Sequence, residues 1–337
     1  MEISRKVRDM SFDVLKGIAT LIVVLGHVLQ YSIKGYENSL IFNIIWSLQI
    51  PLFMIISGYF SISNNQLTSK KLRNQLLRYL WPCVTYFIVL CVAYHYKTPF
   101  LSAYNLLWHL EGTLWYLVVL AILSVFNFVA TNASNKMQNL LRQVLYSIIF
   151  FGLTVLFAVP GLKFGWTFLG IKYVLYYSLF YWLGHMWRFI RALKINNIEV
   201  ITDIVFAGLA IIYFYIICNV NLYAVEDSIM GILPRVIASI SGVYLVCYVV
   251  VKSKRAGKVM RAIAFVGQNS LEIYYIHCVL IRSLESQDVG ILSANGIFTL
   301  AFGFMFIMVA SIGILQVIRQ SEYLYGIIFG AKIKMGR

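Results

Sequence analysis

The stretch 11-SFDVLKGIATLIVVLGHVLQY-31 decides the fold, because nearly every residue after Gly17 is apolar over the length that a bilayer requires. An α-helix turns about 100° and rises about 1.5 Å per residue. Lys16 and His27 are eleven positions apart, so their side chains point in nearly the same direction, roughly 16 Å apart along the axis. Asp13 falls close to the same line. We therefore predict a membrane helix with one polar stripe that faces the protein interior or a wet cavity.

Composition places the whole chain in a membrane. The 337 residues are 61% hydrophobic and only 12% charged, and the mean hydropathy is +0.80. A soluble domain of this length could not cover so much apolar surface, because its exterior must stay hydrated. The net charge of +15 therefore does not indicate nucleic acid, and membrane lipids are the partners that the composition predicts.

Hydropathy predicts ten membrane spans, each close to the length of a bilayer helix. They leave no room for a soluble domain of appreciable size, so residues 1–337 are predicted to form one all-α transmembrane domain. The predicted spans are 13–31, 40–61, 79–95, 112–130, 143–160, 168–187, 201–218, 231–251, 270–287 and 296–318.

The basic residues predict the orientation of these spans. If the N-terminus is cytoplasmic, most of the 28 Lys and Arg residues fall on the cytoplasmic side, as the positive-inside rule expects. Both termini should then be cytoplasmic, and the first apolar run is a span rather than a cleaved signal peptide. The short tail after residue 319 is typical of an interfacial segment. The cytoplasmic basic clusters are 5–8, 70–78, 136–142, 188–194, 252–261 and 319–337.

The five cysteines lie in or beside apolar stretches, without the close spacing of metal ligands. We predict that all five are small buried residues and that the protein binds no metal. His95 and His185 are predicted at the membrane interface. No pair of Gly- or Pro-broken spans recurs in two halves, which disfavours a transporter without removing that alternative.

The polar stripe of the first span is the main candidate for a catalytic site. Lys16 and Asp13 have an ordinary alternative, since both could mark the cytoplasmic interface, where lysine extends its charge to water. His27 lies deeper. A neutral imidazole there is either held by structural hydrogen bonds or acts as a general base. In the second interpretation Asp13 orients Lys16 from one turn away.

Aromatic residues at the outer start of the fourth span predict sugar recognition. Trp108, Trp115 and Tyr116 could stack on sugar faces while the carboxylate of Glu111 binds hydroxyl groups. Glu111 has two alternatives: it could assist His27, or it could be an acid at a hydrated helix N-terminus.

Three further polar residues are candidates for substrate binding. Tyr59 could offer its hydroxyl to a substrate, because the glycine before it allows the chain to approach closely. Arg235 needs an anion if it is buried, which Glu111, Glu226, Asp227 or a ligand could supply. His277 is either a structural hydrogen-bond partner between helices or a residue that binds substrate.

The first span resembles the opening helix of the membrane acyltransferase family 3 proteins, bacterial enzymes that O-acylate cell-surface sugars. Residues 12–19 and 24–27 carry this resemblance. The family hallmark is an arginine, ten residues and a histidine, and this sequence keeps that spacing with Lys16 in the arginine position. With lysine at this position, the sequence resembles the subgroup of fucose 4-O-acetylases and exopolysaccharide O-acetyltransferases. Lysine is a point charge and cannot form the bidentate fork of an arginine.

Four further segments resemble the family in the expected order along the chain, and together they cover most of it. They are 50–60 with a Pro-Leu-Phe run before Ser-Gly-Tyr, 108–117 with Trp-His-Leu and Leu-Trp-Tyr-Leu, 181–185 with Leu-Gly-His, and 267–277 with Gly-Gln-Asn-Ser-Leu and a final histidine.

The resemblance implies a transferase of the bacterial inner membrane. It would move an acetyl group from cytoplasmic acetyl-CoA, as co-substrate, to a hydroxyl of an envelope glycan or lipid-linked sugar. His27 would take the proton of that hydroxyl or carry the acetyl group itself, and Lys16 would hold the donor or polarise its thioester carbonyl. The alternative class is a polysaccharide or small-solute transporter with a path lined by the first helix. The acceptor sugar, a partner protein and the oligomeric state stay open, with a homodimer among the alternatives.

Overall fold

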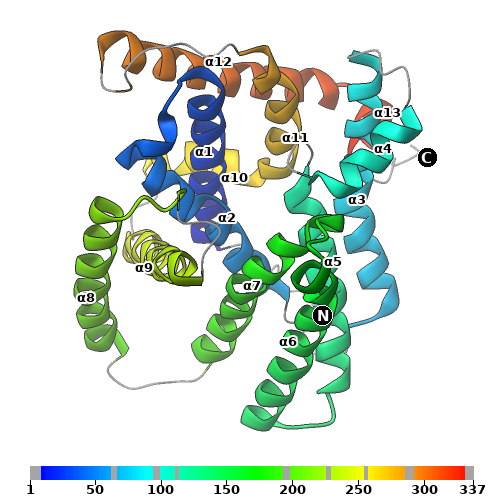
Figure 1. Ribbon diagram of the computed structural model, residues 1–337, viewed down its shortest axis with the longest axis vertical. Helices are drawn as coiled ribbons and strands as arrows, with labels where there is room; N and C mark the ends of the chain where they lie inside the picture. Colours follow the sequence, from blue (N-terminus) through cyan, green and yellow to red (C-terminus); the bar gives the residue numbers. More distant parts are fainter. Residues whose placement is uncertain are drawn as a thin grey trace, which may run out of the picture. The chain divides into compact units, whose positions relative to one another are not determined.

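The computed structural model describes residues 9–61, 67–93, 99–110, 114–192, 198–224, 229–253, 257–284, 291 and 293–330. Their regular structure is helical (Figure 1), as the all-α prediction requires. The chain clusters into two compact units. Unit 1 contains Met1–Ile56 and Ile195–Ala310, and unit 2 contains Ser57–Lys194 and Ser311–Arg337.

Eight helices in the described ranges are long and apolar enough to cross a membrane. They coincide with eight of the ten predicted spans, as expected of a polytopic membrane protein. These helices are α1 (Met10–Ser32), α2 (Leu40–Ser61), α3 (Ser69–Ala93), α5 (Trp115–Ala133), α6 (Asn139–Phe164), α8 (Ile198–Asn219), α9 (Ile229–Lys252) and α12 (Ala294–Arg319).

The predicted spans 168–187 and 270–287 do not meet the same test of length and composition. In the first, a short 3-10 turn (η3, Phe168–Gly170) precedes α7 (Ile171–Ala192), a 22-residue helix whose charged residues lower its hydropathy. The second contains α11 (Ser270–Leu280), of only 11 residues, followed by the turn η4 (Ile281–Ser283). A helix of that length extends about 16 Å, well short of a hydrocarbon core of about 30 Å.

In unit 1, α10 (Lys258–Gln268) packs unusually closely against the start of α1 (Figure 1). A Cβ atom on Gly17 would lie 2.0 Å from the carbonyl oxygen of Ile263, and one on Gly267 would lie 1.8 Å from that of Asp13. Only glycine allows this contact, because any side chain would collide with backbone.

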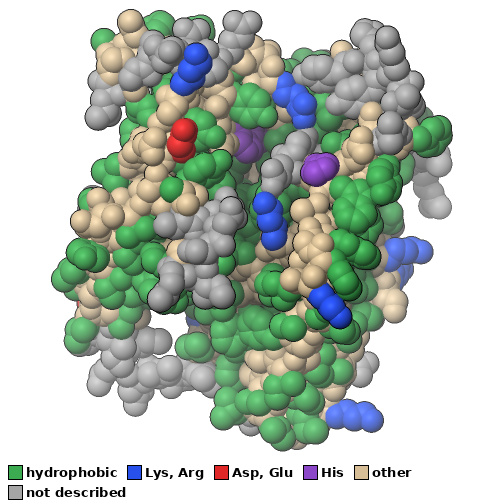
Figure 2. Space-filling model, viewed as in Figure 1, with side chains coloured by type: hydrophobic (Ala, Val, Ile, Leu, Met, Phe, Trp, Pro, Cys, Tyr) green, Lys and Arg blue, Asp and Glu red, His purple; other side chains and the backbone are tan. Residues whose placement is uncertain are grey.

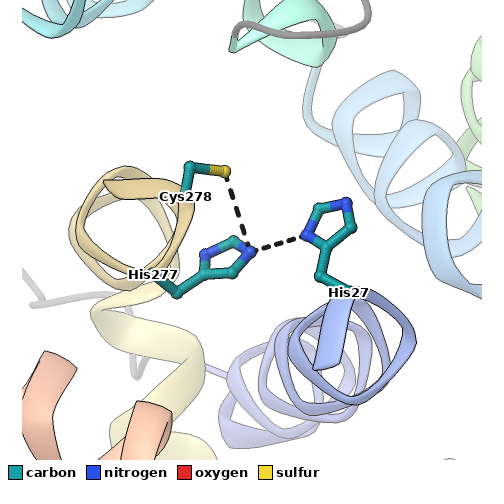
Figure 3. A group of neighbouring side chains, drawn as sticks. All are labelled: His27, His277 and Cys278. Atoms are coloured by element: carbon teal, nitrogen blue, oxygen red, sulfur yellow. Dashed lines mark hydrogen bonds between the residues drawn. The ribbon is translucent and has the colours of Figure 1, made fainter. Parts of the chain in front are cut away.

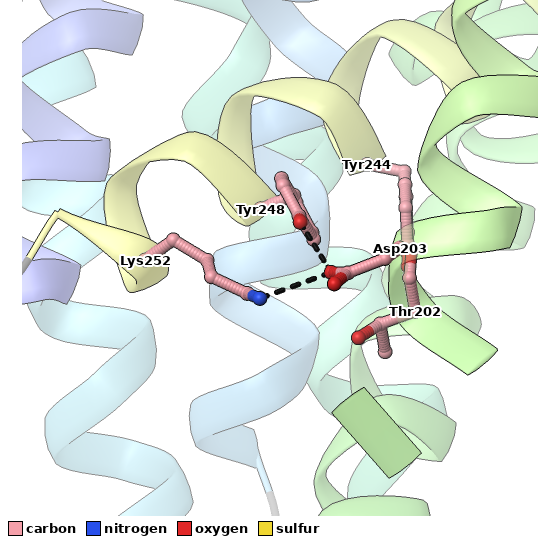
Figure 4. Close-up of polar contacts among 5 residues, drawn as sticks. All are labelled: Thr202, Asp203, Tyr244, Tyr248 and Lys252. Carbon is pink, nitrogen blue, oxygen red and sulfur yellow. Dashed lines mark hydrogen bonds and ion pairs between the residues drawn. The ribbon is translucent and has the colours of Figure 1, made fainter. Parts of the chain in front are cut away.

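The helices α8 and α9 of unit 1 form an antiparallel pair with a polar link at one end (Figure 4). Lys252 Nζ lies 3.0 Å from Asp203 Oδ1, and the hydroxyl of Tyr248 donates to the same carboxylate. The Tyr244 hydroxyl donates to the carbonyl oxygen of Thr202 at 3.1 Å. Because the start of α8 contacts the end of α9 in this way, the two helices run in opposite directions.

The start of α2 is joined to the end of α8 by a buried asparagine. Asn43 Nδ2 donates to the carbonyl oxygens of Ile217 at 3.2 Å and Val220 at 2.9 Å, and its Oδ1 accepts from the amide of Leu222 at 3.1 Å. Helix ends leave carbonyl groups without intrahelical partners, so this side chain supplies what the end of α8 lacks.

Unit 2 packs α3, α5, α6 and α7 together, with α4 (Pro99–Trp108) beside the turn η3. The helix α13 (Glu322–Phe329) lies against α3, where Trp81 Nε1 donates to the carbonyl oxygen of Ile327 at 2.6 Å. Figure 2 shows hydrophobic side chains over much of the visible surface, with isolated basic ones among them. Such a surface is expected of helices that face lipid.

Candidate active site

The helix α1 begins with an N-cap, since the side chain of Asp9 accepts a hydrogen bond from the amide of Ser11 at 3.0 Å. It then continues without a break to Ser32. The geometry expected of an ideal helix therefore applies, with Lys16 and His27 on one side and roughly 16 Å apart along the axis. Both side chains are partly exposed.

His27 meets a second histidine from α11 (Figure 3). The distance between His27 Nδ1 and His277 Nε2 is 2.9 Å, a hydrogen-bond length. The two rings are 5.2 Å apart between centroids and inclined by only 18°. His277 is fully buried, and its Nδ1 lies 3.0 Å from the carbonyl oxygen of Ile273. Two roles were predicted for His277, and this contact is the predicted hydrogen bond between helices.

The other end of the polar stripe also contacts this part of unit 1. Gln268 Nε2 donates to Asp13 Oδ2 at 3.1 Å, and Asp13 is 4% exposed. Thr20, which is buried, donates its hydroxyl to the carbonyl oxygen of Lys16 at 2.8 Å. Since Gln268 lies beside Asp13 and His277 beside His27, α11 runs along α1 in the same direction. The stripe thus faces protein, as polar residues in a membrane helix should.

One group of side chains in the described ranges has the donor atoms of a metal site. His27, His277 and Cys278 each offer one ligand atom, and these atoms lie within 4.8 Å of one another. Cys278 Sγ is 3.7 Å from His277 Nε2 (Figure 3). Imidazole and thiolate donors would suit zinc or copper among the metals. The sequence suggested no such group, because residues 27 and 277 are brought together only by the fold.

The aromatic residues predicted to bind sugar all lie in unit 2, where their contacts differ. The ring of Trp115 packs on Tyr173 at 4.6 Å between centroids, whereas the hydroxyl of buried Tyr116 is 3.2 Å from Ser57 Oγ. Trp108 packs on other aromatic rings, near residue 168. Glu111, the carboxylate predicted beside them, lies outside the described residues.

A small pocket is present next to Trp108. Its volume is about 40 Å³. Two of its lining residues are hydrogen-bonded, since Thr167 Oγ1 donates to the carbonyl oxygen of Trp108 at 2.7 Å. Sequence reasoning missed Thr167, just before the turn η3, and Lys172 and Tyr173, in the first turn of α7. The only available signal was the density of aromatic residues in this part of the sequence. The pocket is lined by Trp108, His109, Leu110, Thr167, Gly170, Lys172 and Tyr173.

Tyr59 lies among basic side chains of unit 2. Its hydroxyl accepts a hydrogen bond from Arg191 Nη1 at 3.3 Å, and its carbonyl oxygen accepts one from Arg188 Nη1 at 3.4 Å. Its ring is 5.0 Å from that of Trp187. The predicted contact of its hydroxyl with substrate stays a prediction, since this hydroxyl already bonds to an arginine.

Arg235 is buried in unit 1, at 6% exposure, with its guanidinium carbon 4.8 Å above the ring of Trp46. A cation over an indole face is stabilised electrostatically, so the aromatic ring provides part of what a buried arginine needs. The predicted anionic partners Glu226 and Asp227 lie outside the described residues, as does His95.

The membrane-interface position predicted for His185 stays a prediction; its side chain is 4% exposed and stacks on Tyr146 with 3.8 Å between ring centroids. The prediction that all five cysteines are buried was wrong. Of the cysteines, Cys247 and Cys278 are buried, but Cys218 is exposed and the other two are only partly buried. Lipid-facing helix surfaces are as apolar as the core, so residue type alone does not separate the two environments.

The fold and site define a class: a polytopic helical membrane protein in which a pair of histidines joins two helices, α1 and α11. The model of the acyltransferase domain family matches residues 10–318, so the chain belongs to this acyltransferase family. The resemblance seen in the first helix and the later motifs is confirmed.

Two curated relatives are similar over part of their length. The chain is 30% identical over 138 residues to Nodulation protein NolL of Mesorhizobium japonicum, covering 36% of this chain and 37% of that protein. It is 31% identical over 142 residues to Nodulation protein NolL of Sinorhizobium fredii, covering 38% and 39%. The chain thus spans well under half the length of these relatives. No solved structure matches the chain.

Proposed function

We propose that the protein is a transmembrane O-acetyltransferase of the bacterial inner membrane. It moves an acetyl group from cytoplasmic acetyl-CoA to a hydroxyl group of an envelope glycan or lipid-linked sugar. The observation that carries this proposal is the partly exposed imidazole of His27, held by His277 inside a chain of the acyltransferase family. A general base is the group that such a transfer needs, because a sugar hydroxyl is a weak nucleophile.

In the proposed reaction the hydroxyl oxygen attacks the thioester carbonyl carbon while His27 takes the hydroxyl proton. The carbon–sulfur bond of the donor then breaks as the tetrahedral intermediate collapses. CoA leaves with the proton as a free thiol, and the acetyl group remains on the sugar as an ester. The acceptor oxygen and the donor carbonyl must therefore both reach His27.

The separation of Lys16 from His27 favours one of the two roles predicted for the lysine. A lysine whose backbone is roughly 16 Å from the base along α1 is too far away to polarise the carbonyl that reacts there. The chain of CoA from its diphosphate to its sulfur has about 13 bonds, which extend roughly 15 Å at the spacing of an extended peptide backbone. Lys16 therefore suits the phosphate end of the donor, with the thioester at His27.

The pocket beside Trp108 supports glycan recognition by unit 2. It is too small for a sugar ring but large enough for one exocyclic group, since a single water needs about 10–15 Å³ by the same measure. Aromatic rings around it, among them Trp108 and Tyr173, would provide the apolar faces on which sugars stack. This pocket would then influence which acceptor binds rather than how fast acetyl is transferred.

The test of this function combines glycan analysis with a reconstituted reaction. Mass spectrometry of surface glycan from cells with and without the gene should show a change of one acetyl group per modified repeat. Purified protein in liposomes should move radiolabel from acetyl-CoA to that glycan. Solute flux in the same liposomes without any acetylated product would contradict the proposal and support the transporter alternative.

A further inference from the structure

We propose that His277 is a positioning residue. It holds the ring of His27 in the tautomer whose proton is on Nδ1, so that Nε2 of His27 keeps a lone pair for the acceptor hydroxyl. The inference rests on the proposed acetyl transfer and gives His277 a role other than binding substrate. It follows from two distances and from the chemistry of neutral imidazole.

The first step concerns His277. Its Nδ1 is 3.0 Å from the carbonyl oxygen of Ile273, one turn earlier in α11. A carbonyl oxygen can only accept, so Nδ1 of His277 must carry the proton of this hydrogen bond. A neutral imidazole has one N–H, and Nε2 of His277 is therefore an acceptor.

The second step concerns His27. Its Nδ1 is 2.9 Å from the acceptor Nε2 of His277, so Nδ1 of His27 must be the donor. The remaining nitrogen, Nε2, then has no proton. The described residues place no hydrogen bond on this atom, and the ring is partly exposed. A general base needs an accessible lone pair within hydrogen-bond reach of its substrate.

This assignment of donor and acceptor nitrogens requires that both histidines are neutral. A second proton on His277 would make both of its nitrogens donors, and His27 would then turn its lone pair toward His277 instead of the substrate. A cation in the fully buried position of His277 would be costly, because it would lie in a membrane helix. During the reaction the proton arriving on Nε2 of His27 leaves Nδ1–H pointing at a neutral acceptor, which stabilises the transient imidazolium.

The same three side chains could hold a metal, but their spacing favours the hydrogen bond. Two imidazole nitrogens on a tetrahedral zinc ion lie about 3.3 Å apart, whereas these nitrogens are 2.9 Å apart. A metal on Nδ1 of His27 would also leave the proton on Nε2, where the base is needed. A bound metal is therefore an outcome that would overturn the proposal.

Ring-nitrogen NMR tests the tautomer directly, whatever the enzyme acetylates. The chain has five histidines, so a sample labelled with 15N-histidine in liposomes gives few signals, and loss of one in His27→Gln assigns it. We expect a protonated Nδ1 and a bare Nε2 for His27, and a loss of this pattern in His277→Met. A protonated Nε2 of His27 in the unaltered protein, or one equivalent of bound metal by elemental analysis, would overturn the proposal.

Kinetics separate positioning from a structural role. His277→Met removes the acceptor and should lower kcat about 100-fold, with the KM for acetyl-CoA within about twofold. His277→Gln places an amide oxygen near the former Nε2 and should keep kcat within about tenfold of the original. The matched control is Ile276→Met, which puts methionine at the neighbouring buried position and should leave kcat unchanged. Equal losses of kcat in His277→Met and His277→Gln would contradict the positioning role. If the unaltered protein transfers no acetyl group, the proposed function is refuted, but the NMR test of the His27 tautomer still applies.

Discussion

Two histidine sites, one in each unit, differ in whether a ring nitrogen is left without a hydrogen-bond partner among the described residues. In unit 2, His185 Nδ1 is 3.4 Å from Ser61 Oγ and Nε2 is 3.2 Å from Gln143 Oε1, and Tyr146 covers the ring. In unit 1, His27 uses one nitrogen, for His277, and remains partly exposed. Both sites lie in apolar helices, yet only the second has a nitrogen available for chemistry.

The difference shows how a structural histidine can be told from a catalytic candidate. A buried polar group must be satisfied, because an unmade hydrogen bond costs about 1–3 kcal/mol. Where both ring nitrogens have partners, this requirement alone explains the residue. Where one nitrogen is satisfied and the other reaches a partly exposed face, packing does not explain the residue and function is the better account.

The largest effect should follow from removing the available nitrogen. His27→Gln retains a polar side chain of similar length but has no group that takes a proton near neutral pH, so acetyl transfer should fall by about 10²–10⁴-fold. Thermal unfolding of the purified variant should be within a few degrees of the original. A transfer rate near the original would show that His27 resembles His185 after all.

The next largest effect tests the close contact between α1 and α10, on which the histidine pair depends. Gly267→Ala would place Cβ 1.8 Å from the carbonyl oxygen of Asp13, so the helices must separate, with an expected loss of about 3 kcal/mol of stability and of transfer activity. The control is Gly208→Ala in α8, where a Cβ meets nothing within 4 Å. Thermal unfolding and transfer assays measure both variants, and equal behaviour would contradict the packing argument.

A smaller and different effect is expected at the histidine of unit 2. His185→Leu removes the hydrogen bond to the partly buried side chain of Gln143, which should cost about 1 kcal/mol of stability. Because His185 has no role in the proposed chemistry, kcat should stay within about twofold. Thermal unfolding and transfer kinetics measure the two quantities separately. A large loss of kcat at unchanged stability would remove the contrast between the two histidine sites.

The smallest effect concerns the aromatic pocket. Trp108→Ala removes one wall of the pocket and should raise the KM for the acceptor glycan about tenfold, since loss of one ring contact costs on the order of 1 kcal/mol. The turnover number should change little, because the base is unaffected. Initial rates at varied glycan concentration measure this. A lower kcat with an unchanged KM would place Trp108 in the chemistry rather than in recognition.

The sequence predicted the class of fold and singled out both His27 and His277, but it did not predict that they contact each other. Hydropathy located the eight helices of spanning length, because an apolar run long enough for a bilayer needs no tertiary context to be recognised. The spacing of Lys16 and His27 placed both on one side of α1 for the same local reason. The break in the predicted span 270–287 was missed, because an apolar composition does not reveal where a helix ends.

The sequence alone determined a polytopic helical membrane protein of the acyltransferase family with one polar helix face, since periodicity and composition are local properties of the chain. Only the tertiary structure decided that His277 pairs with His27, that His185 is satisfied within unit 2, and that Thr167 and Tyr173 join Trp108 around a pocket. Contacts between residues 250 positions apart depend on how helices pack. Among helices that are apolar on every side, the sequence pattern does not specify which faces meet.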